Sequence, residues 1–261
     1  MSSPLTLRPG APESVPGDAD YALNRDRILA SARELVASLS PTLPDAPWHR
    51  GKVYSHKEVD VATETFSTAS AEHPPPGAGD CEGFRWHARR STHRSDKVSY
   101  DHFRQGLLVN HTPNEREYVE SCTQVEQLEV IRQGEFEVWQ TKYVNPFPAA
   151  KRDFVFSILT VDNPTRPSTA DPSRPLRSFI VISIPMTHPK APEKEDYVRG
   201  RYVSVEEVRE EEGGRIVWTM AVSSDAGGRI PRFISERVMP QKISEDVPSF
   251  LKWVQKSAPA S

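Results

Sequence analysis

The sequence contains few cysteines and no long apolar run. Cys81 and Cys122 are the two cysteines among 261 residues, so a disulfide-stapled secreted fold is not expected. No apolar run approaches the roughly 20 residues that a membrane-spanning helix needs, and residues 1–10 lack the apolar core of a secretory signal. These absences predict a protein of the reduced cytoplasm.

A net charge of one sign is also missing. The chain carries 33 basic and 36 acidic residues, which gives a formal net charge of −3. Proteins that hold nucleic acid through its phosphates present a basic field. We therefore predict no nucleic-acid partner.

The motifs of common catalytic and cofactor sites are absent as well. The sequence has no Gly-x-Ser-x-Gly nucleophile elbow, no phosphate-binding or dinucleotide-binding glycine pattern, and no histidine pair at zinc-ligand spacing. Each of the eight histidines is interpreted as a surface or hydrogen-bonded residue rather than a base. We predict no catalytic residue, no metal ligand and no cofactor.

Proline is abundant, with 24 residues, and it separates the segments that can be ordered. Residues 1–18 contain four prolines and two glycines. This composition is typical of chain that cannot bury a core. We predict a disordered tail at residues 1–18 and one domain at residues 19–256.

The spacing of apolar residues predicts an α+β domain with antiparallel strands. Residues 21–39 carry an apolar face at helical spacing, which predicts a helix. The predicted strands lie near residues 52–66, 84–88, 123–131, 135–143, 153–161, 177–185, 199–209 and 215–223, with short helices near 100–109 and 114–122 and a polar turn near 91–97.

The C-terminal stretch organises the rest of the chain. Residues 216–222 are apolar on both alternating faces, which indicates a strand covered on both sides. A glycine turn and Pro231 then introduce an apolar helix pattern that runs to Val254. Pro240 and Pro248 are expected to kink or restart this helix. Its predicted buried face consists of Phe233, Ile234, Val247, Phe250, Leu251 and Val254.

Three segments resemble those of a known family. Residues 150–155 (Ala-Lys-Arg-Asp-Phe-Val), residues 201–209 and the run from Trp218 to Pro231 with its following helix resemble, in this order along the chain, segments of the START (steroidogenic acute regulatory protein-related lipid-transfer) domains. The match covers residues 83–254 and is most like a START-like family found mainly in fungi. The resemblance implies a helix-grip fold, in which a curved antiparallel sheet holds the C-terminal helix around an apolar cavity.

A cavity of this kind would be lined by the apolar strand residues and the start of the last helix. The alternative from the residues alone is an ordinary filled core. Arg152 is a candidate contact for the polar head of a ligand, and the alternative is an ion pair or cap of Arg152 and Asp153 at the strand entry. The candidate lining residues are Phe154, Phe156, Ile158, Ile180, Ile182, Trp218, Met220, Phe233 and Ile234.

A local basic stretch spans residues 85–94 and includes Arg85, His87, Arg89 and Arg90. It could touch lipid headgroups at a membrane surface. The favoured interpretation is a solvated edge strand whose charges oppose aggregation.

The preferred function is non-covalent binding of a lipid or other hydrophobic small molecule. Transfer of that molecule, with transient contact to a membrane surface, would extend this function. One alternative is a cavity-based enzyme, cyclase-like or related, acting on an apolar metabolite. Another is an interaction domain with a filled core. The sequence favours the non-catalytic binding protein and does not identify the ligand.

Overall fold

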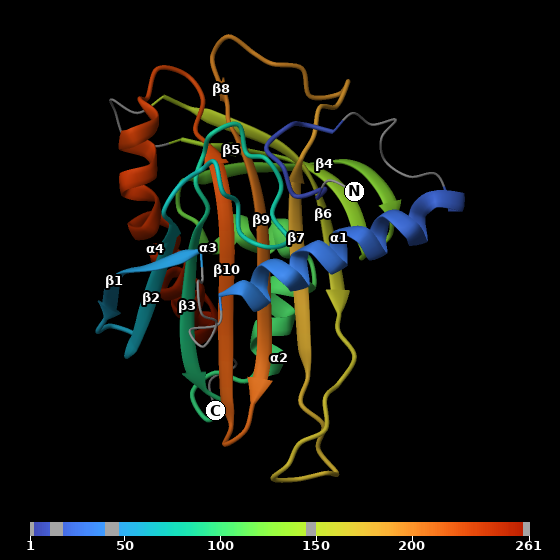
Figure 1. The fold of residues 1–261 in the computed structure, drawn as a ribbon, viewed down its shortest axis with the longest axis vertical. Coiled ribbons are helices and arrows are strands. Elements are labelled where there is room, and N and C mark those ends of the chain that lie inside the picture. Colours follow the sequence, from blue (N-terminus) through green and yellow to red (C-terminus); the bar gives the residue numbers. More distant parts are fainter. Residues whose placement is uncertain (1–2, 11–17, 40–46, 145–149, 258–261) are drawn as a thin grey trace.

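The computed structural model describes residues 3–10, 18–39, 47–144 and 150–257. Within these ranges the chain forms α-helices, a short π-helix and a large β-sheet (Figure 1). No helix in the described ranges is long and apolar enough to cross a membrane.

The ten strands of the described ranges form one sheet. Its order is β1-β2-β3-β10-β9-β7-β6-β5-β4, with all of these neighbours antiparallel, and the short β8 runs parallel to β6. The strands are β1 (Trp48–His56), β2 (Val61–Thr68), β3 (His87–Arg94), β4 (Cys122–Arg132), β5 (Phe136–Tyr143), β6 (Arg152–Asp162), β7 (Ser178–Pro185), β8 (Val198–Arg199), β9 (Arg201–Glu211) and β10 (Arg215–Asp225).

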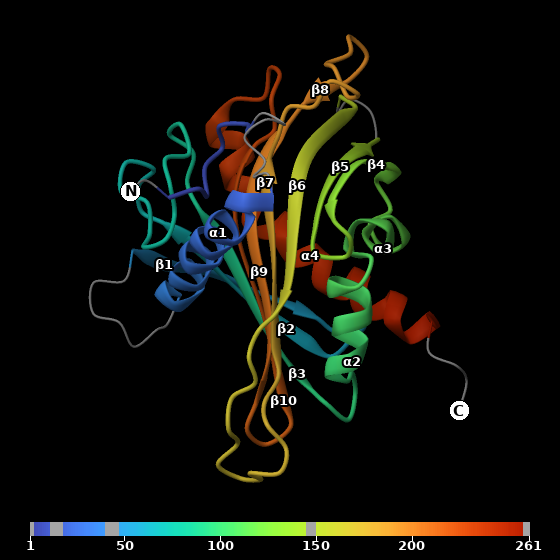
Figure 2. The ribbon, with the colours of Figure 1, turned by 90° about the vertical axis from the view of Figure 1, so that its right-hand side faces the viewer.

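Helices cover both faces of the sheet (Figures 1 and 2). One face packs against α1, and we call it the outer face. The opposite face packs against the other helices, and we call it the inner face. The helices are α1 (Asp18–Ser38), α2 (Tyr100–Phe103), the π-helix η2 (Arg104–Leu108), α3 (His111–Tyr118) and α4 (Arg232–Ser257).

Strand β7 shows why the strand sequences are apolar on both alternations. Phe179 and Val181 belong to the cluster that contains the α4 residues Val247 and Phe250. The intervening Ile180 and Ile182 belong to the cluster that contains the α1 side chains. Because successive side chains in a strand point to opposite faces, a sheet covered on both sides needs apolar residues at nearly every position.

The predicted α+β helix-grip architecture is confirmed: a curved antiparallel sheet holds the C-terminal helix on one face (Figure 2). The predicted turn at residues 91–97 begins too early: β3 continues to Arg94 and pairs with β10 over its whole length, and the turn is formed by residues 95–97. Polar side chains alternate along this part of β3 and suggested a turn, although half of them are buried.

Helix α4 docks through its second half. Val247 and Phe250 are fully buried, and the helix continues as one element through Pro240 and Pro248. Gly106 of η2 allows the close approach, since a Cβ there would lie 2.4 Å from the Phe250 ring. The first half of α4 differs from the predicted buried face, because Phe233 is 70% exposed and Ile234 is 43% exposed.

Part of the predicted N-terminal tail is packed against the domain. Residues 3–10 lie over the outer face, and Leu5 and Leu7 are fully buried in the cluster that contains the α1 residues. The Gly10 backbone N–H donates to the carbonyl of Pro185, and Gly10 forms a parallel bridge with Met186, just after the end of β7. Leu5 and Leu7 are separated by a single residue, so both side chains lie on the same face of the segment. This spacing lets a short segment bury two leucines. Residues 1–2 and 11–17 of the predicted tail lie outside the described residues.

This packing predicts that the N-terminal segment stabilises the domain. Replacing Leu7 by Ala should lower the free energy of unfolding by about 2–5 kcal/mol, because it deletes a fully buried side chain. Leu23→Ala on α1 removes the same atoms from a side chain that is 65% exposed and serves as the matched control. Urea denaturation measures both, and equal midpoints for Leu7→Ala and wild type would contradict the packing.

Candidate functional site

The candidate site begins with the alternation of β3. His87, Arg89, Ser91 and His93 occupy every second position and are all buried. They lie on the inner face, since Ser91 pairs with Trp218 and Arg89 with Met220 on β10. The favoured interpretation of this stretch as a solvated edge strand is wrong, because β3 lies between β2 and β10.

Arg89, Glu206 and Trp218 form a buried ionic unit. Arg89 Nη2 donates to Glu206 Oε1 at 3.0 Å, and Trp218 Nε1 donates to the same oxygen at 2.6 Å. The guanidinium carbon lies 4.0 Å from the centre of the Trp218 ring, in a cation–π arrangement. Arg89 and Glu206 pair with the same residue of β10, Met220, from opposite sides, so the ion pair crosses over that strand.

Such an ion pair is weak support for stability on its own. Burying two charges costs several kcal/mol per ion in lost hydration. This cost is about as large as the free energy that the attraction between the two charges returns. Arg89 also leaves two of its donors, Nε and Nη1, buried without a hydrogen-bond partner. A well-packed apolar core would avoid both costs, so these residues are candidates for contact with a bound molecule.

Helix α3 adds a second polar group to the same face. Glu115 and Tyr118 are three positions apart and therefore share one side of the helix. Tyr143 on β5 donates its hydroxyl hydrogen to Glu115 Oε1 at 2.9 Å. Desolvation raises the pKa of Glu115, and Glu206 raises it further against the opposing effects of His111 and Tyr143. Desolvation also raises the pKa of Tyr202, which faces this group from β9.

Helix α4 contributes one carboxyl group to the inner face. Burial raises the pKa of Asp246 to about 7, and the nearby Glu115 and Glu206 add to this shift, whereas Arg89 opposes it. Arg89, Glu115, Glu206 and Asp246, from four different elements, thus come close enough to influence one another. We call these four residues the polar cluster.

Aromatic side chains surround the polar cluster. Phe154 packs edge-on against both Tyr143 and Tyr202, with ring centres 5.5 Å apart in each pair. On the α4 side, Phe250 packs against Trp218 at 5.2 Å and Tyr118 at 5.6 Å. The inner face therefore combines a small polar group with a large apolar surface, which is the usual composition of a small-molecule site.

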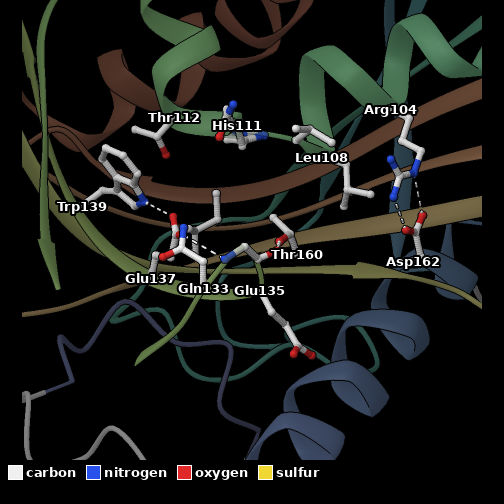
Figure 3. A pocket seen from close by; sticks show the side chains of 14 residues that line it. Arg104, Leu108, His111, Thr112, Gln133, Glu135, Glu137, Trp139, Thr160 and Asp162 are labelled. Atoms are coloured by element: carbon white, nitrogen blue, oxygen red, sulfur yellow. Dashed lines mark hydrogen bonds and ion pairs between the residues drawn. The ribbon is translucent and has the colours of Figure 1, made fainter. Parts of the chain in front are cut away.

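A pocket of about 310 Å³ opens at one end of the inner face (Figure 3). One wall comes from η2 and the start of α3, and the other from β5, β6 and the turn between β4 and β5. Trp139 and Ile158 in this pocket also belong to the inner-face cluster of Trp218. The pocket volume is at the lower end of the range for small-molecule sites. The lining residues are Arg104, Leu108, Val109, Asn110, His111, Thr112, Gln133, Gly134, Glu135, Glu137, Trp139, Ile158, Thr160 and Asp162.

The charged groups of this pocket are held by the protein itself. Arg104 pairs with Asp162 through two hydrogen bonds of 2.6 and 3.3 Å, and Glu137 accepts from Trp139 Nε1 at 3.0 Å. Thr112 Oγ1 is buried and has no hydrogen-bond partner in the described residues. Figure 3 shows this hydroxyl on the side of the pocket that faces Trp139.

The structure separates the predicted lining residues into three groups. Phe154, Phe156, Ile158, Trp218 and Met220 lie on the inner face, and Phe154 and Met220 among them are only half-buried. Ile180 and Ile182 point to the outer face and pack toward α1, which corrects their assignment to the lining. Phe233 and Ile234 are exposed, which corrects their assignment as well, because the helix turn that carries them extends beyond the sheet.

Arg152 and Asp153 are each held by other residues of the chain. Arg152 Nε donates to the Ala226 carbonyl at 2.9 Å, which ties the start of β6 to the loop before α4. Asp153 accepts two hydrogen bonds from Arg199, at 3.0 and 2.8 Å, and one from Gln140 at 2.8 Å. Arg152 Nη1 also donates to the Ala150 carbonyl at 3.0 Å. These hydrogen bonds match the interpretation of Arg152 as a cap at the strand entry.

The functional candidates that the sequence did not single out are Arg89, Glu115, Glu206 and Asp246. All residues of β3 except Ala88 are polar or charged, so the sequence alone does not separate the buried Arg89 from the half-buried Arg90. Glu206 is likewise followed directly by a second glutamate in β9. No group of histidine, cysteine or acidic residues in the described ranges has the arrangement of a metal site.

The fold places the protein in a structural class. Human StAR-related lipid transfer protein 5 superposes with a TM-score of 0.67 at 14% identity, over 92% of this chain and 99% of the human chain. Human STARD10 superposes with a TM-score of 0.57 at 15% identity, over 93% and 84%. The fold is that of the START domains, and the predicted resemblance is confirmed.

The sequence comparison identifies the family. The chain belongs to the family described as "Protein of unknown function (DUF3074)", whose model matches residues 86–254. A relative in Schizosaccharomyces pombe, the uncharacterized protein C577.11, is 28% identical over 186 residues, which is 68% of this chain and 71% of that protein.

Two histidines of β3 are buried in the neutral form. Burial lowers the pKa of His87 to about 4, with a smaller contribution from Arg85. Burial lowers the pKa of His93 to about 3, with a smaller contribution from Arg89. Each ring has a serine hydroxyl within hydrogen-bond distance, Ser67 for His87 and Ser91 for His93, both at 2.8 Å.

These shifts predict that His93 weakens the fold in acid. Below about pH 6.5 the unfolded chain binds a proton at this ring that the folded chain does not bind, so stability falls as the pH is lowered. The contribution is about 1.4 kcal/mol per pH unit below that value. His93→Gln should reduce the slope of unfolding free energy against pH by this amount, as measured by urea denaturation between about pH 7 and pH 5. The exposed His49→Gln is the control, and an unchanged slope in His93→Gln would contradict the buried neutral ring.

Proposed function

We propose that this protein binds a lipid or other hydrophobic small molecule without covalent chemistry, between the inner face of the sheet and α4. The observation that carries the proposal is a group of inner-face side chains that are only half-buried, namely Glu115, Tyr118, Tyr202 and Met220. Desolvation nevertheless raises the pKa values of Glu115, Tyr118 and Tyr202. Side chains that keep accessible surface and are nevertheless poorly hydrated support our proposal that the ligand occupies a space between the sheet and α4.

The names of the structural neighbours support the same proposal. Human StAR-related lipid transfer protein 5 shares the fold, and its name describes a lipid-transfer protein. Binding would gain free energy by removing apolar surface from water, at about 25 cal/mol per Å². Cys81 and Cys122 are buried free thiols, which supports a cytoplasmic location for this activity.

Transient contact with a membrane surface is part of the proposal. The start of α4 carries three large apolar side chains with exposed surface: Phe233 is 70% exposed, Ile234 43% and Val238 46%. Arg229 and Arg237 are exposed beside them. Apolar residues flanked by basic ones are suited to an anionic membrane surface, where a ligand could enter or leave as α4 moves.

This membrane contact predicts an effect of Phe233→Ser on vesicle binding. Removing a phenyl ring that enters the interface should weaken binding to vesicles with phosphatidylserine by about tenfold, because a buried phenylalanine contributes about 1.5–3 kcal/mol. Leu23→Ser on α1 removes a similarly exposed apolar side chain from the opposite side of the sheet and is the control. Vesicle co-sedimentation measures both variants, and equal losses would show that this end of α4 has no special role.

The ligand site predicts an effect of Met220→Trp. Met220 lies on the inner face and is half-buried, so a larger side chain can occupy the proposed space without displacing the core. We expect the uncharged fluorescent probe Nile red to bind wild type, and Met220→Trp to weaken binding at least about tenfold through lost volume.

Val130→Trp on the exposed side of β4 adds a large side chain away from the site and is the control. Circular dichroism checks that both variants are folded. If wild type binds neither Nile red nor any lipid that native mass spectrometry detects, the proposed function is wrong.

A further inference from the structure

The N-terminal segment is hydrogen-bonded to residues 77–85, which precede β3 and which we call the linking loop. Ser3 Oγ donates to the Gly77 carbonyl at 2.6 Å, and the Gly79 backbone N–H donates to the Leu5 carbonyl at 2.9 Å. The two backbones approach closely at Gly79, where a Cβ would lie 2.9 Å from the Leu5 carbonyl oxygen. The position of the N-terminal segment therefore restrains the position of the linking loop.

The linking loop in turn holds the start of α4. Arg232 donates to the carbonyls of Gly83 and Glu82, at 3.0 and 3.3 Å. Glu236 accepts from the Arg85 backbone N–H at 2.9 Å. Arg232 and Glu236 are four positions apart and lie on one side of the helix. The first turn of α4 is thereby tied to the linking loop by polar contacts.

Apolar packing gives little support to this part of α4. Phe233 and Val238 are exposed, and the buried apolar side chains of the helix begin at Ile243. Polar contacts at the surface contribute little free energy individually, so a helix end that depends on them opens locally at a low cost. The contacts with the linking loop therefore set how firmly the start of α4 is held.

Arg201 of β9 joins the same three parts of the molecule. Its Nη1 donates to Glu82 Oε2 at 2.8 Å and to the Leu7 carbonyl at 3.4 Å, and its Nη2 donates to Asp225 Oδ2 at 2.7 Å. Asp225 ends β10, and its other carboxylate oxygen accepts from the Gly227 N–H at 2.9 Å in the turn before α4. A continuous set of contacts thus runs from the N-terminal segment to α4, through the linking loop and through this arginine.

We propose that the N-terminal segment is a strap that controls the opening of α4. While Leu5 and Leu7 are buried on the outer face, the linking loop is fixed and the start of α4 is held. When the strap leaves this face, the linking loop loses these restraints and the start of α4 opens more often, while its second half stays docked. Only the consequence, that such opening admits a ligand, rests on the function proposed above.

Hydrogen exchange of the full chain, without ligand or membrane, tests this coupling. The double variant Leu5→Ser with Leu7→Ser places hydroxyls in an apolar cluster and so favours release of the strap. The backbone amides of residues 234–239 should then exchange at least about tenfold faster than in wild type, because they exchange by local opening. The control is Ile180→Ala, which deletes a fully buried side chain of the same cluster from β7. It should leave these amides unchanged, and residues 247–254 should respond alike in both variants.

Two further variants show whether the effect passes through the linking loop. Gly79→Ala keeps both leucines and pushes against the Leu5 carbonyl, so it should also speed exchange at residues 234–239, even if the double variant does not fold. Arg232→Met removes the donors that α4 presents to the linking loop. In its background, Gly79→Ala should have little further effect, since both changes break one set of contacts. Arg237→Met, at an exposed position of the same helix, is the control.

The outcomes separate the strap from the proposed function. Unchanged exchange at residues 234–239 in both strap variants would overturn the proposal, and so would an equally large effect of Ile180→Ala, since it would reflect a general loss of stability. Where the strap variants speed this exchange, stopped-flow fluorescence should show Nile red associating several-fold faster than with wild type. An unchanged association rate would show that the strap does not regulate the site. If wild type does not bind Nile red, the proposed function fails, and the exchange rates still decide whether the strap controls α4.

Discussion

The structure depends on one constraint, which is that its sheet is covered on both faces. Strands β6, β7, β9 and β10 lie in the middle of the sheet and can expose neither alternation of their side chains to water. One face packs against α1 and the N-terminal segment, and the other against α4 with α2, η2 and α3. Each apolar side chain of these strands is therefore committed to one of two cores with different partners.

The two cores differ in chemistry. The outer core combines aliphatic residues of α1 and of the strands with the two leucines of the N-terminal segment and with rings such as Trp48 and Trp86. The inner core contains rings from several elements, including Phe103, Trp218 and Phe250, next to a buried ion pair. Buried charge adds little to stability unless its partners and hydrogen bonds are complete. The incomplete pairing of Arg89 beside this ion pair is the reason why we propose the inner face as the ligand-binding one.

Helix α4 links this inner face to the surface. Its second half is docked by Val247 and Phe250, over a glycine of η2 that lets the ring approach. Its first half leaves Phe233 exposed to solvent. Asp246 lies between these halves and belongs to the polar cluster. In the function proposed above, a displacement of α4 would change the exposed apolar surface and the polar cluster together.

The sequence by itself determined the elements of this protein, because helix and strand periodicity are local properties. The α+β order, the docked Val247 to Val254 part of α4 and the antiparallel strands could be predicted in this way. The tertiary structure decided which face each strand residue occupies, since alternation gives two faces but not what covers them. Ile182 therefore packs toward α1, and Arg89 is buried on a central strand rather than solvated at an edge. The grouping of Arg89, Glu115, Glu206 and Asp246 comes from four separate elements, and no local pattern in the sequence specifies it.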